Sequence, residues 1–125
     1  RAEKIARVAG YIPELEVSGA EEGKLLVVGW GGTYGHLVSA VSQVRASGKE
    51  IGYAHFDYIN PLPGNTEEVF SRYDEILVCE LNSGHFVNYL RGILPQYRYQ
   101  QYNKVQGQPF LVQELAAAIE KAFED

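Results

Sequence analysis

The sequence predicts an α/β fold, a three-layer sandwich in which a mostly parallel sheet of four to five strands carries helices on both faces. Residues 25–28, LLVV, form a continuous apolar run, which is typical of a strand buried on both faces. A glycine-rich turn follows, and then apolar residues recur at the spacing of one helical face; these are Leu37, Ala40, Val41 and Val44. Strand, glycine turn and helix in this order open a parallel α/β unit.

The first half of the chain contains the elements around this unit. Residues 1–10 are expected to be a linker or helical tail from an upstream domain, and residues 11–125 one domain. Residues 11–17, with Pro13, suit an extended edge piece, and residues 18–24 a solvated turn. The first core helix ends near Gly48, and residues 51–56 are the second strand. A proline-stiffened loop leads to a helix that Asn65 or Thr66 caps and that buries a set of apolar side chains. That set is Val69, Phe70 and Tyr73.

The second half repeats the strand–helix order. Residues 75–81 are the third strand, and a helix that Pro95 ends buries Phe86, Val87, Leu90 and Leu94. Residues 97–105 alternate aromatic and polar side chains loosely and are expected to form a fourth strand. The last helix has one apolar stripe, made of Leu111, Leu115, Ala118, Ile119, Ala122 and Phe123. Right-handed crossovers then place helices on both faces of the sheet.

Composition excludes several classes of function. The 125 residues suit a single domain, and the net charge of -5 makes nucleic acid a poor partner. The sequence shows neither a membrane-spanning run nor a signal pattern, so a cytoplasmic protein without a membrane partner is expected. The single cysteine excludes an internal disulfide and a cysteine-rich metal site. Because the chain lacks methionine and starts at Arg1, we interpret it as a piece of a longer protein.

Four loops are expected at the carboxyl edge of the sheet, where ligands of such folds gather. They are residues 29–35, 57–65, 80–85 and 103–109. The first loop matches a dinucleotide fingerprint only in part, since Gly29 and Gly31 fit but position 34 is Tyr34. The weak cofactor-binding candidates are Gly31, Gly32, Thr33, Gly35 and Asp57. The favoured interpretation is that the glycines only let the chain turn closely over the sheet.

The sequence predicts no catalytic residue and no metal site. His55 is expected to be a packed, hydrogen-bonded strand residue, and Cys79 an inert thiol in a buried strand. The other two histidines start helices, where they are either exposed cap residues or contacts to a partner. Glu80 and Asp57 follow strands and either pair as acid and base or bind backbone amides of neighbouring loops.

Four segments of the chain resemble a known family. They are VVGWGGTYGH, AHFDYINPLPGNT, VCELNSGHFVNYLR and YNKVQGQPF. Over about residues 11–122 the chain is similar to the domain that closes the alpha subunit of 2-oxoacid:ferredoxin oxidoreductases, especially the 2-oxoglutarate type. That domain resembles the C-terminal domain of transketolase. Two positions depart from the family pattern: Gly32 stands where a serine is expected, and His85 where a glutamine is expected. Family contacts through a hydroxyl at 32 or an amide at 85 are therefore not carried over.

The resemblance implies a parent complex that oxidatively decarboxylates a 2-oxoacid with coenzyme A and passes electrons to ferredoxin. Thiamine diphosphate, magnesium and iron–sulfur clusters would bind on other domains or subunits. This chain would be a structural and assembly domain, inactive alone, with the rest of the alpha subunit and the beta subunit as partners. Interface residues are expected on the edge loops. They are Tyr34, Tyr58, Asn60, Asn82, His85 and Gln106.

Two other functions remain open from the sequence. A stand-alone nucleotide-binding module would use the turn from Gly29 to Gly35 together with Asp57. An acidic adaptor unrelated to 2-oxoacids is the second.

Overall fold

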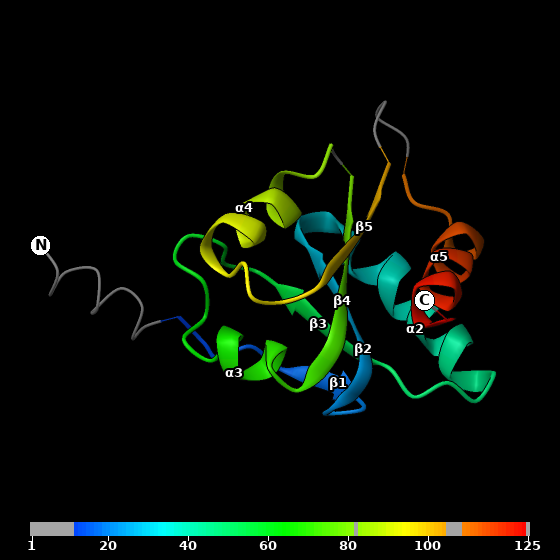
Figure 1. Ribbon diagram of the computed structural model, residues 1–125. Coiled ribbons are helices and arrows are strands. Elements are labelled where there is room, and N and C mark those ends of the chain that lie inside the picture. The colour runs from blue at the N-terminus through cyan, green and yellow to red at the C-terminus, as the bar shows by residue number, and fades with distance from the viewer. Residues whose placement is uncertain (1–11, 82, 105–108, 125) are drawn as a thin grey trace, which may run out of the picture.

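The computed structural model describes residues 12–81, 83–104 and 109–124. A five-stranded sheet in the order β1-β3-β2-β4-β5 forms its middle layer (Figure 1). The strands are β1 (Val17–Gly19), β2 (Gly23–Trp30), β3 (Gly52–Phe56), β4 (Tyr73–Glu80) and β5 (Tyr99–Asn103). β1 is antiparallel to β3, and the other neighbouring pairs are parallel. The predicted α/β fold with a mostly parallel sheet is confirmed.

Helices cover both faces of this sheet. They are α2 (Tyr34–Ala46), α3 (Thr66–Phe70), α4 (His85–Ile93) and α5 (Val112–Glu124), with a short 3₁₀ turn η1 (Gly31–Thr33) before α2. α2 and α5 pack side by side on one face, while α3 and α4 lie on the other (Figure 1). Leu25 and Val27 of β2 point to the first face, and Leu26 and Val28 point to the second. This alternation explains why all four positions of the LLVV run are apolar.

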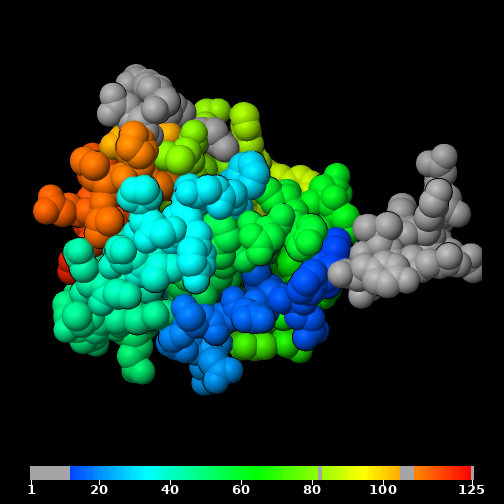
Figure 2. Space-filling view, turned by 180° about the vertical axis from the view of Figure 1, so that it is seen from behind, coloured from blue at the N-terminus to red at the C-terminus, as the bar shows by residue number. Residues whose placement is uncertain are grey.

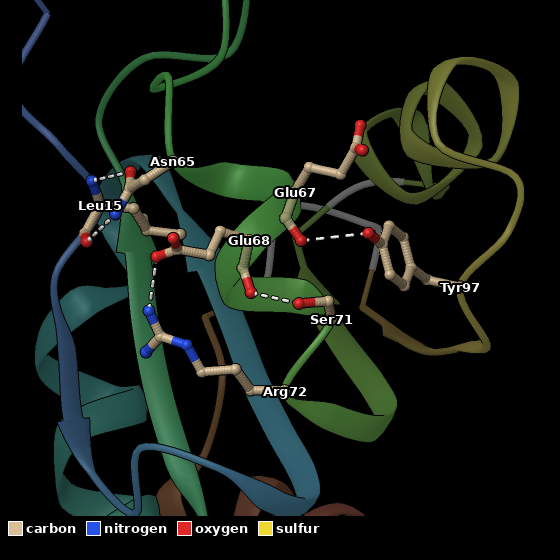
Figure 3. A network of polar contacts seen from close by, with 7 residues as sticks. All are labelled: Leu15, Asn65, Glu67, Glu68, Ser71, Arg72 and Tyr97. Atoms are coloured by element: carbon tan, nitrogen blue, oxygen red, sulfur yellow. Dashed lines mark hydrogen bonds and ion pairs between the residues drawn. The ribbon is translucent and has the colours of Figure 1, made fainter.

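The region of α3 differs from the prediction. α3 ends at Phe70, and Tyr73 begins β4, where its hydroxyl donates a 2.6 Å hydrogen bond to the Ala20 carbonyl. Neither predicted cap residue caps the helix with its side chain. Asn65 instead exchanges two hydrogen bonds with the backbone of Leu15 (Figure 3), and the Thr66 hydroxyl donates to the Pro63 carbonyl. The helix itself is present as predicted, with Asn65 at its N-cap position and with Val69 and Phe70 buried. The roles of the Asn65 and Tyr73 side chains differ because each binds a backbone group about 50 positions away in the sequence.

The segment before β2 also differs in its boundaries. An extended edge piece is present, but the strand itself is Val17–Gly19, and β2 already begins at Gly23, inside the predicted turn. Only three residues therefore separate the two strands. Gly19 and Gly23 have φ angles of 81° and 141°, which L side chains rarely adopt, so glycine suits this tight connection.

The last two elements follow the sequence more closely. β5 lies within the predicted fourth strand. In α5, Leu115, Ile119 and Ala122 are buried as expected, but Leu111 precedes the helix and is 54% exposed. Leu94 follows α4 and is only partly buried. The predicted tail over residues 1–10 lies outside the described residues.

Candidate functional site at the carboxyl edge of the sheet

Three loops meet at the carboxyl edge of the parallel strands, as the sequence predicts. Gly29 at the end of β2 lies beside His55 of β3 and Cys79 of β4 in the sheet register. The segments that follow these strands therefore leave the sheet at neighbouring positions. The fourth predicted loop falls mostly on residues 105–108, outside the described part of the chain.

In the glycine turn, the fold requires glycine at two positions and does not require it at two others. A Cβ at Gly29 would overlap Leu37 Cδ1 of α2, and Gly31 has a φ of 69°. Gly32 and Gly35 have no neighbouring atom within 4 Å of a built Cβ, and neither has a positive φ in the glycine range. The structural interpretation thus explains Gly29 and Gly31. At positions 32 and 35 the surface is open, so packing does not require glycine there.

The candidate hydroxyl in this turn is already engaged. Thr33 is buried, and its Oγ1 donates a 3.1 Å hydrogen bond to the Trp30 carbonyl at the end of β2. This bond closes the 3₁₀ turn from within. Among the weak cofactor candidates, Thr33 therefore has an internal structural role, whereas Asp57 is exposed.

His55 links β3 to the glycine turn. Its Nε2 lies 2.9 Å from the Gly31 carbonyl oxygen, and its Nδ1 lies 2.9 Å from the Tyr53 hydroxyl. Because a carbonyl only accepts, Nε2 carries a proton, and in the tautomer with a single proton Nδ1 accepts from the Tyr53 hydroxyl. Burial raises the pKa of Tyr53, so its hydroxyl stays protonated. Tyr34 packs edge-on against the imidazole at 5.2 Å, so His55 is a packed, hydrogen-bonded residue as expected.

Glu80 joins the β2 and β4 loops from a fully buried position. Its Oε1 accepts hydrogen bonds from Trp30 Nε1 at 3.2 Å and the Phe86 amide at 2.8 Å, and its Oε2 accepts from the Val87 amide at 2.9 Å. A carboxylate suits this place because it faces the positive end of α4. Of the two roles that the sequence left open for Glu80, the structure therefore shows amide binding.

The predicted interface residues are described in part. Tyr34 and Tyr58 are 57% and 49% exposed, and Asn60 and His85 are exposed as well. Asn82 and Gln106 lie outside the described residues. The structure thus brings side chains of several loops to the surface of one edge.

Other candidate chemistry is not found among the described residues. Cys79 is fully buried, and burial raises the pKa of its thiol, so it has the properties of an inert core residue. No group of three acidic, cysteine or histidine side chains in the described ranges could hold a metal ion. No described helix has the length and apolar character needed to cross a membrane.

Sequence reasoning missed a groove beside α2. It has a volume of about 570 Å³, and Tyr53 and His55 of β3 lie on it together with residues 13–18 and one side of α2. Glu14, Glu16 and Asp57 contribute carboxylates to its lining. One side of the groove is the segment that leads into β1, which pairs antiparallel with β3, and no local pattern in the sequence indicates that pairing.

Comparison with known proteins shows which enzyme subunits the chain is similar to. A curated relative, the 2-oxoglutarate oxidoreductase subunit KorA of Mycobacterium tuberculosis H37Rv, is 36% identical over 123 residues, 94% of this chain and 18% of the relative. The alpha subunit of 2-oxoacid:ferredoxin oxidoreductase 1 from Aeropyrum pernix is 32% identical over 77 residues, 57% of this chain and 12% of that subunit. The chain is homologous to part of a 2-oxoacid:ferredoxin oxidoreductase alpha subunit. It spans less than a fifth of the length of these two relatives. No protein-family model matches it.

Two solved structures share the fold of this chain. The 2-oxoglutarate:ferredoxin oxidoreductase from Magnetococcus marinus, solved with 2-oxoglutarate, coenzyme A and succinyl-CoA bound, matches with a TM-score of 0.85 and 20% identity over 94% of this chain and 21% of that chain. A split-gene transketolase, an inactive beta4 tetramer, matches with a TM-score of 0.66 and 14% identity over 87% of this chain and 41% of that chain. The predicted transketolase-like fold is confirmed.

Proposed function

We propose that the chain is a structural and assembly domain of the alpha subunit of a 2-oxoacid:ferredoxin oxidoreductase, with 2-oxoglutarate as the 2-oxoacid. The parent complex would decarboxylate the 2-oxoacid oxidatively with coenzyme A and reduce ferredoxin. The observation that carries this proposal is the 36% identity to the Mycobacterium tuberculosis 2-oxoglutarate oxidoreductase subunit across 94% of the chain. Thiamine diphosphate, magnesium and the iron–sulfur cluster would be held by other parts of the complex.

The polar groups of the edge support a role in assembly. Glu80 and Thr33 use their side-chain oxygens to bind neighbouring backbone or indole groups, and His55 uses both ring nitrogens inside the domain. Such bonds fix the loops in one arrangement before a partner arrives. A rigid edge with preset loops is well suited to docking.

Exposed aromatic rings support the same role. Tyr34 and Tyr58 have about half of their surface exposed at this edge, and tyrosines often anchor protein interfaces. With Asn60 and His85 they would face the other domains of the alpha subunit or the beta subunit. Asn82 and Gln106 remain part of the proposed interface from the sequence. Ferredoxin would interact with the complex as a whole.

An activity assay tests the proposal. The purified chain is mixed with a 2-oxoacid, coenzyme A and an artificial electron acceptor, next to the complete complex as a positive control. We expect turnover from the complex and none above blank from the chain. A tagged copy of the chain should also retain the beta subunit in a pull-down with the remaining alpha-subunit domains. Turnover by the chain alone would contradict the assembly role.

A stand-alone nucleotide-binding module is the second candidate, favoured by the open surface at Gly32 and Gly35. Titration calorimetry with dinucleotides and with coenzyme A decides between the two. We expect no binding, because one set of parallel strands lacks the second half that completes a dinucleotide crevice. Micromolar binding that Asp57→Ala abolishes would favour the nucleotide-binding function instead.

A further inference from the structure

The groove beside α2 lies over a part of the sheet that the helices do not cover. Ser18 of β1 lies opposite Tyr53 of β3 in the register, and both line the groove. Glu16, which directly precedes β1, lines the groove as well. Figure 2 views the molecule from behind and shows the β1 segment in blue below the cyan and teal surface of α2. The groove thus has the sheet as its floor and α2 as one wall.

The charges of the groove are separated along its length. Glu14 and Glu16 precede β1 in the sequence. Because β1 runs antiparallel to β3, they lie near the carboxyl end of β3, where Asp57 also lies. Arg45 lines the groove from the last turn of α2, eleven residues and thus about 16 Å along the helix axis from Tyr34. Its guanidinium donates to the Ser18 carbonyl at 2.6 Å and through Nε to the Ile51 carbonyl at 3.3 Å. The cation is therefore fixed at the opposite end from the carboxylates.

The three carboxylates are available for a partner. The ion pairs among the described residues join Lys49 to Glu120, Arg72 to Glu68 and Lys104 to Glu114. The acidic end of the groove is formed by Glu14, Glu16 and Asp57. Among the described residues, the side chains of these three take part in none of the ion pairs and in no hydrogen bond. All three are exposed, so their negative charge is not compensated within the described chain.

Two exposed aromatic rings accompany these carboxylates. Tyr34 and Tyr58 line the same end of the groove, and Tyr34 is held against His55 and Tyr53 at centroid distances of 5.2 and 6.2 Å. A planar guanidinium can stack on such rings while its N–H groups bind a carboxylate in pairs. An ammonium lacks both the plane and the paired donors.

We propose that the acidic end of this groove binds an arginine side chain of a partner protein. The charge complementarity and the tyrosine rings select the guanidinium, and residues 13–18 and α2 flank the segment that carries it. The partner would be another domain or subunit of the oxidoreductase, and that identity rests on the proposed function. The preference for arginine is a property of this chain and is measured separately.

NMR titration of the isotope-labelled chain with a blocked Gly-Arg-Gly-Arg-Gly peptide measures this preference, with the matching lysine and glutamate peptides beside it. We expect amide shifts concentrated at Tyr34, His55 and Tyr58, and at least about fivefold tighter binding of the arginine peptide than of the lysine peptide. Glu16→Lys and Asp57→Lys should each weaken binding about tenfold or more. Glu67→Lys on α3 is the matched control and should leave it within about twofold.

Several outcomes would overturn the proposal. Equal binding of the arginine and lysine peptides would show that only net charge matters, and shifts outside the groove would place the site elsewhere. An equal loss in Glu67→Lys would likewise show an unspecific charge effect. Sedimentation analysis adds one more test: a dimer that Glu16→Lys separates would make a second copy the occupant and contradict a different partner. Failure of the chain to retain the beta subunit would contradict the proposed function, while the peptide titration would still decide the groove.

Discussion

The side chain of Asn65 pairs with the backbone of Leu15 as a neighbouring strand would. Its Nδ2 donates to the Leu15 carbonyl at 2.9 Å, and its Oδ1 accepts from the Leu15 amide at 2.7 Å (Figure 3). This residue pair, 50 positions apart, fixes the segment before β1 to the start of α3. Leu15 also lines the groove, so the Asn65 amide helps to hold one side of the groove in place.

Asn65→Asp tests this dependence. The substitution keeps the acceptor but replaces the donor by an oxygen that faces the Leu15 carbonyl, so we expect a loss of about 1 to 3 kcal/mol in the free energy of unfolding. Hydrogen exchange of the Leu15 amide should accelerate as well. Asn60→Asp in the exposed loop is the control, and an equal loss there would contradict the assigned role of Asn65.

Glu80 should be among the most sensitive polar positions. Glu80→Ala leaves the Phe86 and Val87 amides and the Trp30 indole without their acceptor, which should lower the unfolding free energy by about 2 to 4 kcal/mol. Glu80→Gln keeps the shape and one acceptor, and should cost less. Urea unfolding measures both. A neutral effect of the alanine would show that water replaces the carboxylate without penalty.

Gly29 and Gly32 should differ sharply in their tolerance of a methyl group. Gly29→Ala forces Leu37 of α2 to move and should cost about 1 to 3 kcal/mol in unfolding free energy. Gly32→Ala has open space and should change stability little. Thermal unfolding of the two variants separates the close-packed glycine from the exposed one. Equal costs at both positions would mean that the turn, not the helix contact, requires glycine.

The proposed interface tyrosines should be dispensable for stability but needed for assembly. Tyr34→Ala and Tyr58→Ala remove rings that are about half exposed, so the melting temperature should change little, while binding in the full complex weakens by about 2 kcal/mol or more. Leu115→Ala empties a fully buried site and should cost about 2 to 5 kcal/mol of stability. If the tyrosine variants destabilise the chain as much, the rings belong to the core.

Alkaline pH should weaken the fold through Tyr73. Burial raises its pKa to about 12, whereas a tyrosine in the unfolded chain titrates near about 10. Between these values the unfolded chain has released the proton and the folded chain still holds it, so stability falls as pH rises from about 10 to 12. Tyr73→Phe should be less stable at neutral pH, because it loses the bond to Ala20, but should show a smaller alkaline fall. Tyr58→Phe is the control for an exposed ring.

Local sequence patterns predicted the elements whose neighbours lie close along the chain. The LLVV strand, the glycine turn and α2 follow one another directly, and the apolar spacing of α5 placed Leu115 and Ile119 correctly in the core. Tyr73 was misplaced because its bond to Ala20 links residues 53 positions apart.

The candidate site shows the same limit. The sequence correctly predicted that the loops after the strands meet at the carboxyl edge of the sheet. Parallel strands bring these loops together whatever their side chains are. The role of Glu80 was one of two possibilities, because only the folded chain brings Trp30 within hydrogen-bonding distance. The groove and the carboxylates of Glu14 and Glu16 were missed, because their positions depend on the antiparallel pairing of the three-residue strand β1 with β3.

The bond between Trp30 and Glu80 also provides an optical reporter. Trp30 is the single tryptophan of the chain, and its indole packs on Phe86 at 6.0 Å while its N–H binds a buried carboxylate. Its fluorescence therefore originates at the junction of two edge loops. A partner that shifts either loop should change the emission wavelength or intensity of the natural sequence without any attached dye.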